Sequence, residues 1–382
     1  MSSTLRPADL LHGDEHVGNG PQDRADVAPP ISVASTFRSD PDPEAIEFAD
    51  GDMRNPKRHV YSRYTQDVRG RTEHILSKIN ALTHYAPKRI AVRDGYFGCH
   101  ESFEIYKRGR DVEIVDLDVD YQEGDLCWLE TPVNPTGESR DLKYYAEKVH
   151  KVGGKLVVDS TLGPPPLQYP FKFGADCILH SATKYFGGHS DLLAGVLIVK
   201  TEEEWSELMH DRTYLGMVTG SLESWLLLRS LRTLHLRIPR QSENATALAK
   251  WLQTIVEETA SGKPYDGVPP GIIKQVYHSS LQQTDARGFH PKTQMEGGYN
   301  ALFAITLTNV KKAKHLPAKT QLFVSATSLG GVESLIEYRN RADAREDPLL
   351  VRISVGVEDI EELKDDLRQA LQKVAELKAQ NE

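Results

Sequence analysis

Short apolar runs alternate with longer amphipathic stretches between residues 61 and 235. Apolar runs of this length, bounded by polar and glycine residues, predict β-strands, and the amphipathic stretches predict helices. Strands that alternate with helices are typical of a doubly wound, mostly parallel α/β sheet. The predicted strands are 90–92, 112–117, 126–129, 156–159, 177–180 and 195–199.

The pattern changes at both ends of this region. Residues 1–60 are polar and rich in proline, with little periodicity, and predict an extended N-terminal arm. Residues 221–251 predict a mostly helical segment that leads into a smaller α+β C-terminal domain over 236–382. The last helix, which begins near Ile360, has one apolar face and one charged face and is predicted to pack on that domain.

Composition narrows the class of protein. The 382 residues suffice for two domains with their own cores. The formal charge of −9 and the lack of a long basic run argue against a nucleic-acid partner. No run approaches the roughly 18 apolar residues of a membrane span, and no signal peptide is visible. The 3 cysteines form no CxxC pair, which favours a reducing compartment over disulfides or zinc. We therefore expect a cytoplasmic protein with no membrane or metal partner.

The strongest chemical signal is Lys184. It follows Ser181 and Thr183, precedes two glycines, and lies 25 residues after Asp159, which ends an apolar strand. An enzyme needs this pairing when it holds an aldehyde cofactor as a Schiff base on lysine and pins the cofactor's pyridinium nitrogen with a carboxylate. The pair predicts a pyridoxal-phosphate enzyme. The alternative is a solvated lysine in a loop.

A second signal lies one strand earlier. Residues 130–137, rich in proline and ending in glycine, follow the apolar run 126–129 and predict a strand that leads into a turn. Asn134 then lies at the carboxyl end of a strand, where open α/β sheets bind their ligands. The alternative is a proline-rich turn without chemistry.

Nine motifs in order resemble the Cys/Met-metabolism family of pyridoxal-phosphate enzymes, the transsulfuration group that includes cystathionine γ-synthases, γ-lyases and β-lyases. The resemblance implies a fold-type I transferase, with a cofactor-binding domain over 61–235. The motifs are 28–31 with 35–37, 61–64, 94–98, 130–137, 157–161, 180–188 with 190–191, 226–229, 328–335 and 350–354.

The resemblance implies a cofactor role for each matching residue. Lys184 would carry pyridoxal 5'-phosphate and move the substrate's α-proton, and Asp159 would keep the ring nitrogen protonated. Tyr96 would stack on the ring, and Asn134 would bond its phenolic oxygen. The groups expected at the phosphate are Ser181, Thr183 and, from the neighbouring subunit, Tyr61 and Arg63.

The same resemblance places the substrate and the partner chain. Arg352 would bind the α-carboxylate of an amino-acid substrate as a bidentate fork, with Ser328 and Asn134 beside it. Lys184, Tyr96 and Tyr61 would be the catalytic residues, in a homodimer or homotetramer with shared active sites. Taken alone, Arg352 could instead be the polar face of a half-buried strand, and Tyr96 a turn aromatic packed on the core.

The sequence departs from the family at three places, the least consequential of which is a short segment between Gly109 and Leu126, where the family has a surface helix. Roughly twenty residues are missing between Asn80 and Tyr96, where the family has a strand and a Ser-Gly turn whose N–H groups cradle the phosphate. Thr327 stands where γ-lyases usually carry Glu, so β- and γ-chemistry both stay open. We expect an enzyme that acts on cystathionine or an O-acylated homoserine, or alternatively a catalytically impaired relative that serves as a subunit. An aminotransferase is a third reading, which residues 328–335 disfavour.

Overall fold

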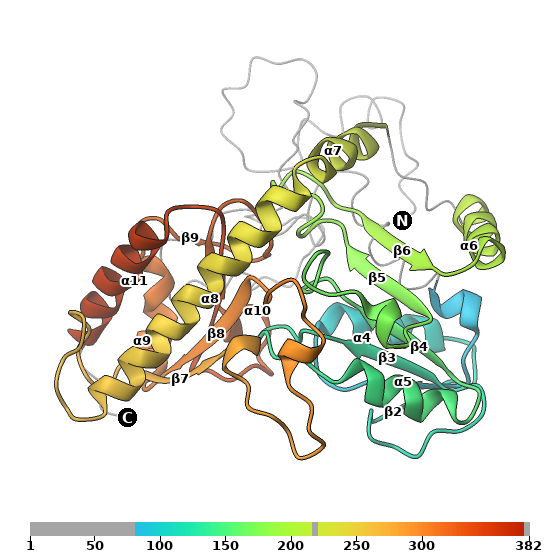
Figure 1. Ribbon diagram of the computed structural model, residues 1–382, viewed down its shortest axis with the longest axis horizontal. Helices are drawn as coiled ribbons and strands as arrows, with labels where there is room; N and C mark the ends of the chain where they lie inside the picture. The colour runs from blue at the N-terminus through green and yellow to red at the C-terminus, as the bar shows by residue number, and fades with distance from the viewer. Residues whose placement is uncertain (1–80, 216–220, 378–382) are drawn as a thin grey trace, which may run out of the picture.

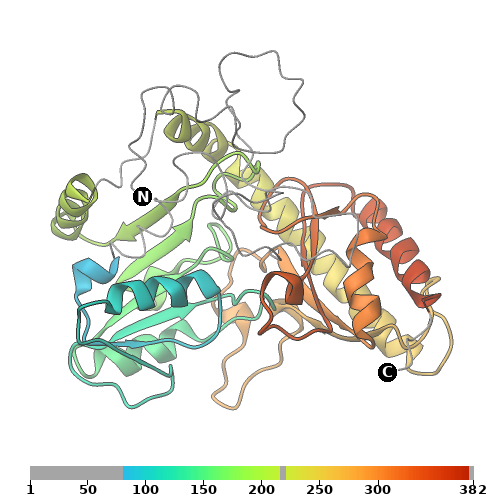
Figure 2. The same ribbon diagram turned by 180° about the vertical axis from the view of Figure 1, so that it is seen from behind.

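The computed structural model describes residues 81–215 and 221–377 of the chain. These residues form two β-sheets joined by a long helix, with the first sheet and its helices on one side and the second sheet on the other (Figures 1 and 2). The predicted arm 1–60 and the residues Tyr61 and Arg63 lie outside the described residues.

The first sheet has six strands in the described residues, in the order β2-β1-β3-β4-β5-β6. All pairs are parallel except β5 with β6. Each predicted strand is found to within two residues, so the predicted α/β fold class is confirmed. The strands are β1 (Arg89–Ala91), β2 (Glu113–Val115), β3 (Leu126–Glu130), β4 (Lys155–Asp159), β5 (Cys177–Ser181) and β6 (Gly195–Val199).

Helices cover both faces of this sheet because its inner strands are apolar on both sides. On one face α4 (Phe97–Lys107) packs Phe103 against Trp128 of β3. On the other face α5 (Leu142–His150) packs Leu142 among the strand residues that point the opposite way. Alternating strand residues thus enter two separate cores, as a doubly wound sheet requires.

The second sheet has five strands in the described part of the chain, in the order β7-β8-β11-β10-β9. Its pairs are antiparallel except β9 with β10, which matches the predicted α+β character of the C-terminal region. The strands are β7 (Ile273–Tyr277), β8 (Leu302–Leu307), β9 (Val324–Ser325), β10 (Leu335–Tyr338) and β11 (Leu350–Ser354).

Two helices share one large core with the second sheet. The long helix α8 (Leu234–Thr259) crosses the molecule and connects the two halves (Figure 1). The last helix, α11 (Ile360–Ala375), buries Leu363, Leu367 and Leu371 as its sequence pattern predicts. The remaining helices are α6 (Glu202–Tyr214), α7 (Ser221–Leu231), α9 (Val310–His315) and α10 (Arg339–Ala342), with 3-10 turns at Pro170–Phe173, Ser279–Leu281, Pro291–Thr293 and Leu316–Ala318.

The first sheet ends at β6, and the segment where the sequence departs from the family leads into β1. Within the described residues β6 pairs only with β5. A helical segment ends at Tyr85, and residues 86–88 alone separate it from β1. No strand therefore stands between that helix and β1.

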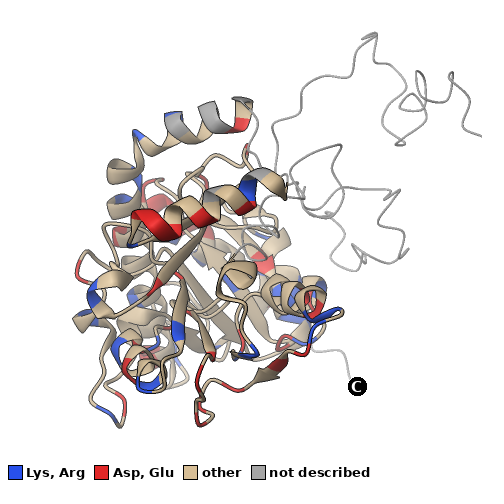
Figure 3. Ribbon diagram, turned by 90° about the vertical axis from the view of Figure 1, so that its right-hand side faces the viewer, with Lys and Arg blue, Asp and Glu red and all other residues tan. Residues whose placement is uncertain are grey.

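The surface carries both signs of charge. In the ribbon of Figure 3, basic and acidic residues are interspersed along the described chain rather than separated by sign. The acidic first turn of α6, Glu202 to Glu204, lies on this surface. Within 81–215 and 221–377, none of the helices combines the length and the apolar character that a bilayer crossing requires.

The three cysteines are all buried in the cores of the first sheet. Burial raises the pKa of the Cys127 thiol to about 12 and that of the Cys177 thiol to about 12. Because the thiolate is the reactive form, we expect no modification of the native protein by Ellman's reagent at pH 8. The same protein in guanidinium should release three equivalents. Rapid modification of any thiol in the native protein would show that the first sheet is not packed as described.

Candidate functional site

Polar side chains gather where β3, β4 and β5 end. Glu130 and Asp159 are the last residues of neighbouring parallel strands and stand opposite each other in the register. Ser181 ends the next strand, β5. Because parallel strands end at the same edge of a sheet, these residues share one carboxyl edge, the location that such folds use for ligands.

Lys184 lies in a tight turn just beyond this edge. The turn is closed by backbone bonds from Lys184 N–H to the Ser181 carbonyl, 3.0 Å, and from Gly188 N–H to the Lys184 carbonyl, 2.6 Å. The Lys184 Nζ donates to Ser328 Oγ at 2.8 Å. Ser328 lies 144 residues away, between β9 and β10, so this bond joins the two halves of the molecule.

A glycine permits this approach of the two chain segments. Gly330 has a φ of +79°, and a Cβ there would lie 2.8 Å from the backbone nitrogen of Tyr185. The loop that carries Ser328 could not come so close to the Lys184 turn with a larger residue. Within the family-like run 328–335, Gly330 thus has a steric role.

Arg352 of β11 reaches the same place from the second sheet. Its Nη1 donates to Asn134 Oδ1 at 2.9 Å, and its Nη2 donates to the Ser328 carbonyl at 2.9 Å. The Nη2 also forms an ion pair with Glu337 at 2.5 Å. Arg352 is only 4% exposed. It therefore does not form the solvated face of a half-buried strand.

Asp159 is held by the residues that follow it. The Thr161 hydroxyl and N–H donate to Asp159 Oδ1 at 2.6 and 3.1 Å. The Ser181 N–H donates in turn to the Thr161 hydroxyl at 2.8 Å. Thr161 therefore orients the carboxylate and ties it to the end of β5.

The two predicted phosphate donors differ in their surroundings. The Ser181 hydroxyl is buried and has no hydrogen-bond partner within the part of the chain that the structure describes. The Thr183 hydroxyl contacts the backbone of Ala194, accepting from its N–H at 3.1 Å and donating to its carbonyl at 3.4 Å. A buried hydroxyl without a partner costs free energy, so Ser181 is the donor that a ligand oxygen would satisfy.

Glu130 is a residue that the sequence reasoning did not single out. Its Oε2 accepts from the Tyr96 N–H and its Oε1 from the Asn134 N–H, each at 2.7 Å. One carboxylate thus positions both the predicted stacking residue and the amide that contacts Arg352. The available signal was an acidic residue at the end of a strand that is otherwise apolar.

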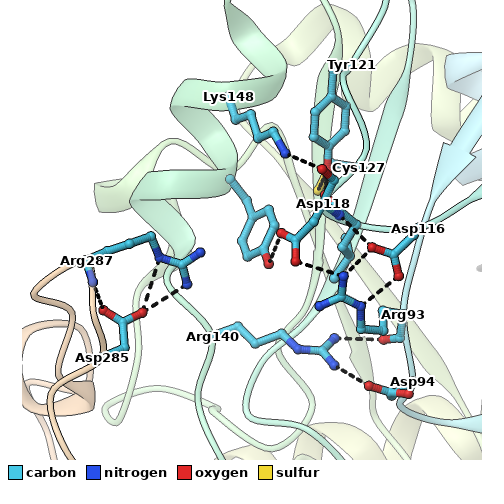
Figure 4. A network of polar contacts seen from close by, with 12 residues as sticks. Arg93, Asp94, Asp116, Asp118, Tyr121, Cys127, Arg140, Lys148, Asp285 and Arg287 are labelled. Carbon is cyan, nitrogen blue, oxygen red and sulfur yellow. Dashed lines mark hydrogen bonds and ion pairs between the residues drawn. The ribbon is translucent and has the colours of Figure 1, made fainter.

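A network of charged residues supports the turn before Tyr96 (Figure 4). Arg140 donates to the Arg93 carbonyl at 2.8 Å and to Asp94 Oδ2 at 3.2 Å. Arg93 pairs with Asp116 and Asp118, and its guanidinium holds the pKa of Asp116 well below the usual range. These contacts tie together the loops that follow β1, β2 and β3.

Three potential metal ligands lie near one another in the described residues. Atoms of Cys99, Glu130 and Asp159 lie within 4.8 Å of each other. However, the carboxylates of Glu130 and Asp159 already accept the N–H and O–H donors named above. Their arrangement serves positioning, and we assign no metal site here.

Thr183 bonds to the backbone of Ala194, and the other predicted residues fall into three groups. Lys184, Ser328, Arg352 and Asn134 are joined directly by hydrogen bonds. Others lie along the same carboxyl edge and are linked through Glu130 or Thr161. These are Tyr96, Asp159 and Ser181. Tyr61 and Arg63 lie outside the described residues.

Comparisons with known proteins identify a family and a fold for this chain. A model of the family described as Cys/Met metabolism PLP-dependent enzyme matches residues 90–372. The chain is 32% identical to the cystathionine gamma-synthase of Escherichia coli, covering 96% of each protein. It is 38% identical to that of Mycobacterium tuberculosis over 64% of this chain, and it spans 61% of that relative's length. The structure of MetB from Corynebacterium glutamicum superposes with a TM-score of 0.69 at 26% identity, covering 94% of this chain and 96% of that one.

The Glu130 carboxylate leaves no room for a side chain at Gly95. Gly95 has a φ of +87°, and a Cβ there would lie 2.5 Å from Glu130 Oε2. We expect Gly95→Ala to lower the free energy of unfolding by about 2–4 kcal/mol, because it adds displacement of Glu130 to backbone strain. Urea denaturation measures this loss.

Gly124 provides the matched control. It has a φ of +79° with nothing within 4 Å of its would-be Cβ. Gly124→Ala should therefore show the backbone strain alone, about 1 kcal/mol. Equal losses in the two variants would mean that Glu130 does not hold this turn.

Proposed function

The chain belongs to the Cys/Met metabolism family of pyridoxal-phosphate-dependent enzymes, and we propose that it makes or breaks a carbon–sulfur bond of cystathionine or an O-acylated homoserine. One observation carries the proposal. Lys184 from the first sheet and Arg352 from the second both contact Ser328, so an amine and a guanidinium face one small site. An α-amino acid offers the carboxylate that such a guanidinium recognises.

The residues present fit the family's cofactor, pyridoxal 5'-phosphate. A lysine amine, a strand-end carboxylate and a buried hydroxyl without a partner lie on one carboxyl edge, at Lys184, Asp159 and Ser181. When bound, the cofactor supplies a conjugated ring that accepts the electron pair of the substrate's α-carbon. The buried Ser181 hydroxyl would gain a phosphate oxygen as its missing acceptor.

Lys184 and Asp159 would each handle a different proton. Lys184 would bind the cofactor covalently through Nζ, and the same nitrogen would take and return the substrate's α-proton. Asp159, oriented by Thr161, would hold a proton on the ring nitrogen. Before the cofactor binds, Ser328 accepts a hydrogen bond from the Lys184 amine.

The remaining site residues would bind and orient. Arg352 would bind the substrate carboxylate. Asn134 and Ser328 accept hydrogen bonds from its two Nη atoms and so fix the orientation of the guanidinium plane. Tyr96 would lie against the ring, on the turn that Glu130 positions. Thr183, Tyr61 and Arg63 complete the proposed phosphate site, the last two from a neighbouring subunit.

We also propose a cytoplasmic homodimer or homotetramer with shared sites. Apolar side chains that face solvent in one chain support this part of the proposal. Leu222, Leu231 and Leu236 of α7 and α8 are 41%, 38% and 63% exposed. Helix α7 projects from the body of the molecule (Figure 1). A second copy would cover these leucines. The division into a cofactor-binding domain, 61–235, and a C-terminal domain, 236–382, rests on the two sheets, with α8 beginning at Leu234.

The alternative proposal is an impaired relative that acts as a subunit. Residues 86–88 alone separate the helix that ends at Tyr85 from β1, so the described chain offers no Ser-Gly turn at this edge. Loss of two or three charge-assisted bonds of about 1.5–3 kcal/mol each would weaken cofactor binding by roughly a thousandfold or more.

Turnover of cystathionine tests the proposed function. The purified protein with saturating pyridoxal phosphate should release a keto acid from cystathionine, or form cystathionine from an O-acylated homoserine and cysteine. Among the elimination products, 2-oxobutyrate indicates γ-chemistry and pyruvate indicates β-chemistry. Lys184→Ala should lose at least about a thousandfold in rate, since the covalent attachment and the proton carrier both disappear.

Borohydride labelling distinguishes a wrong assignment of the cofactor-binding lysine from a lack of enzymatic activity. Reduction of the loaded protein should link the cofactor to the peptide that contains Lys184. Labelling at Lys184 without any turnover would select the impaired relative. Labelling of another lysine would overturn the site assignment itself.

A further inference from the structure

We infer that Glu337 is a positioning residue that holds the guanidinium of Arg352 in place for the substrate carboxylate. The inference rests on the proposed role of Arg352 and adds a residue for which the sequence motifs predict no role. The antiparallel pairing of β10 with β11 brings the two residues together. Glu337 of β10 stands directly opposite Arg352 of β11 in the antiparallel register.

One carboxylate oxygen serves two cations. Glu337 Oε2 lies 2.5 Å from Arg352 Nη2 and 3.2 Å from Arg339 Nη1. The exposed fractions of Arg352, Arg339 and Glu337 are 4%, 3% and 8%. Charges buried this deeply interact strongly because little water screens them.

The charge state of Glu337 follows from its neighbours. Burial pushes the pKa of Glu337 upward, but the guanidinium groups of Arg352 and Arg339 outweigh burial and hold it below the usual value. Glu337 is therefore ionised across the physiological pH range. It separates two like charges that would otherwise repel each other at close range.

The two arginines differ in their other contacts. Arg339 has a second carboxylate partner, Glu346, at 3.1 Å. Arg352 makes its other contacts named above with neutral groups, the Asn134 amide and the Ser328 carbonyl. If the charge on Glu337 were lost, Arg339 would keep the carboxylate of Glu346, and Arg352 would lose the carboxylate that aligns it.

Thr327 links this ion cluster to the lysine. Its hydroxyl donates to the Glu337 carboxylate. The next residue, Ser328, accepts from Lys184 and from Arg352. Thr327 is also the position at which the sequence departs from the γ-lyase pattern. The position of Glu337 is thus coupled to both ends of the proposed substrate site.

The inference is tested by comparing the affinities of two ligands that differ only in a carboxylate. Norleucine and pentylamine share an amine and a linear alkyl chain, and only norleucine carries a carboxylate. Titration calorimetry on the pyridoxal-phosphate-loaded protein gives a Kd for each. We expect Glu337→Gln to raise the Kd of norleucine by about tenfold or more, and that of pentylamine by less than about twofold.

Glu346→Gln is the matched control. It removes a carboxylate from the same cluster, but one that pairs with Arg339. Both Kd values should stay within about twofold of the unmodified protein. The inference would be overturned if Glu337→Gln raised both Kd values equally or left the Kd of norleucine unchanged. Glu337 would then be a purely structural counter-ion.

Arg352→Ala distinguishes failure of the inference from failure of the proposed function. If that variant keeps the preference for norleucine, Arg352 is not the carboxylate clamp. If it loses the preference while Glu337→Gln keeps it, the clamp stands and the inference fails. Should Glu337→Gln not fold, Thr327→Val removes the hydroxyl donor alone. This variant should raise the Kd of norleucine by about two- to fivefold and leave the Kd of pentylamine unchanged. An unchanged Kd of norleucine would contradict the inference.

Discussion

The hydrogen bond between Arg352 and Asn134 joins the two sheets at the point where the candidate site lies. It runs from β11 of the second sheet to the loop after β3 of the first, at 2.9 Å and in a buried setting. The Lys184 contact to Ser328 crosses the same boundary. Neither sheet alone brings an amine and a guanidinium together. The site therefore exists only because the second sheet is held against the carboxyl edge of the first.

Close backbone approaches keep that boundary in place. The Val332 N–H donates to the Gly188 carbonyl at 2.9 Å, just after the Lys184 turn. The Ser279 N–H donates to the Gly137 carbonyl at 3.1 Å, at the end of the Asn134 loop. A Cβ on Gly137 would collide with the backbone at Leu302. The glycines of the motifs thus allow two chain segments to meet, and the polar residues of the candidate site lie between them.

Local pattern was enough to predict the elements that carry the site. The apolar runs predicted all six strands of the first sheet, because each run is bounded by polar or glycine residues. The inner strands β3 and β5 are buried along their whole length. Asp159 and Asn134 could be placed at the carboxyl edge because that location follows from a strand's direction alone. Lys184 was visible from its hydroxyl and glycine neighbours.

Contacts that depend on register between distant strands could not be read from the sequence. Glu337 precedes Arg352 by 15 residues, and their pairing appears only once β10 and β11 are aligned. Glu130 belonged to a recognised motif, but its bonds to Tyr96 and Asn134 depend on loop geometry. The roles of Tyr61 and Arg63 rest on a second subunit and stay predictions.

A double-mutant cycle on Asn134→Ala and Arg352→Ala tests most directly whether this contact joins the two halves. The free energy of unfolding of the two single variants and the double variant gives the coupling between the side chains. A buried hydrogen bond to a charged group predicts a coupling of about 1.5–3 kcal/mol. Losses that add to within about 0.5 kcal/mol would contradict the account, because the two side chains would then act independently.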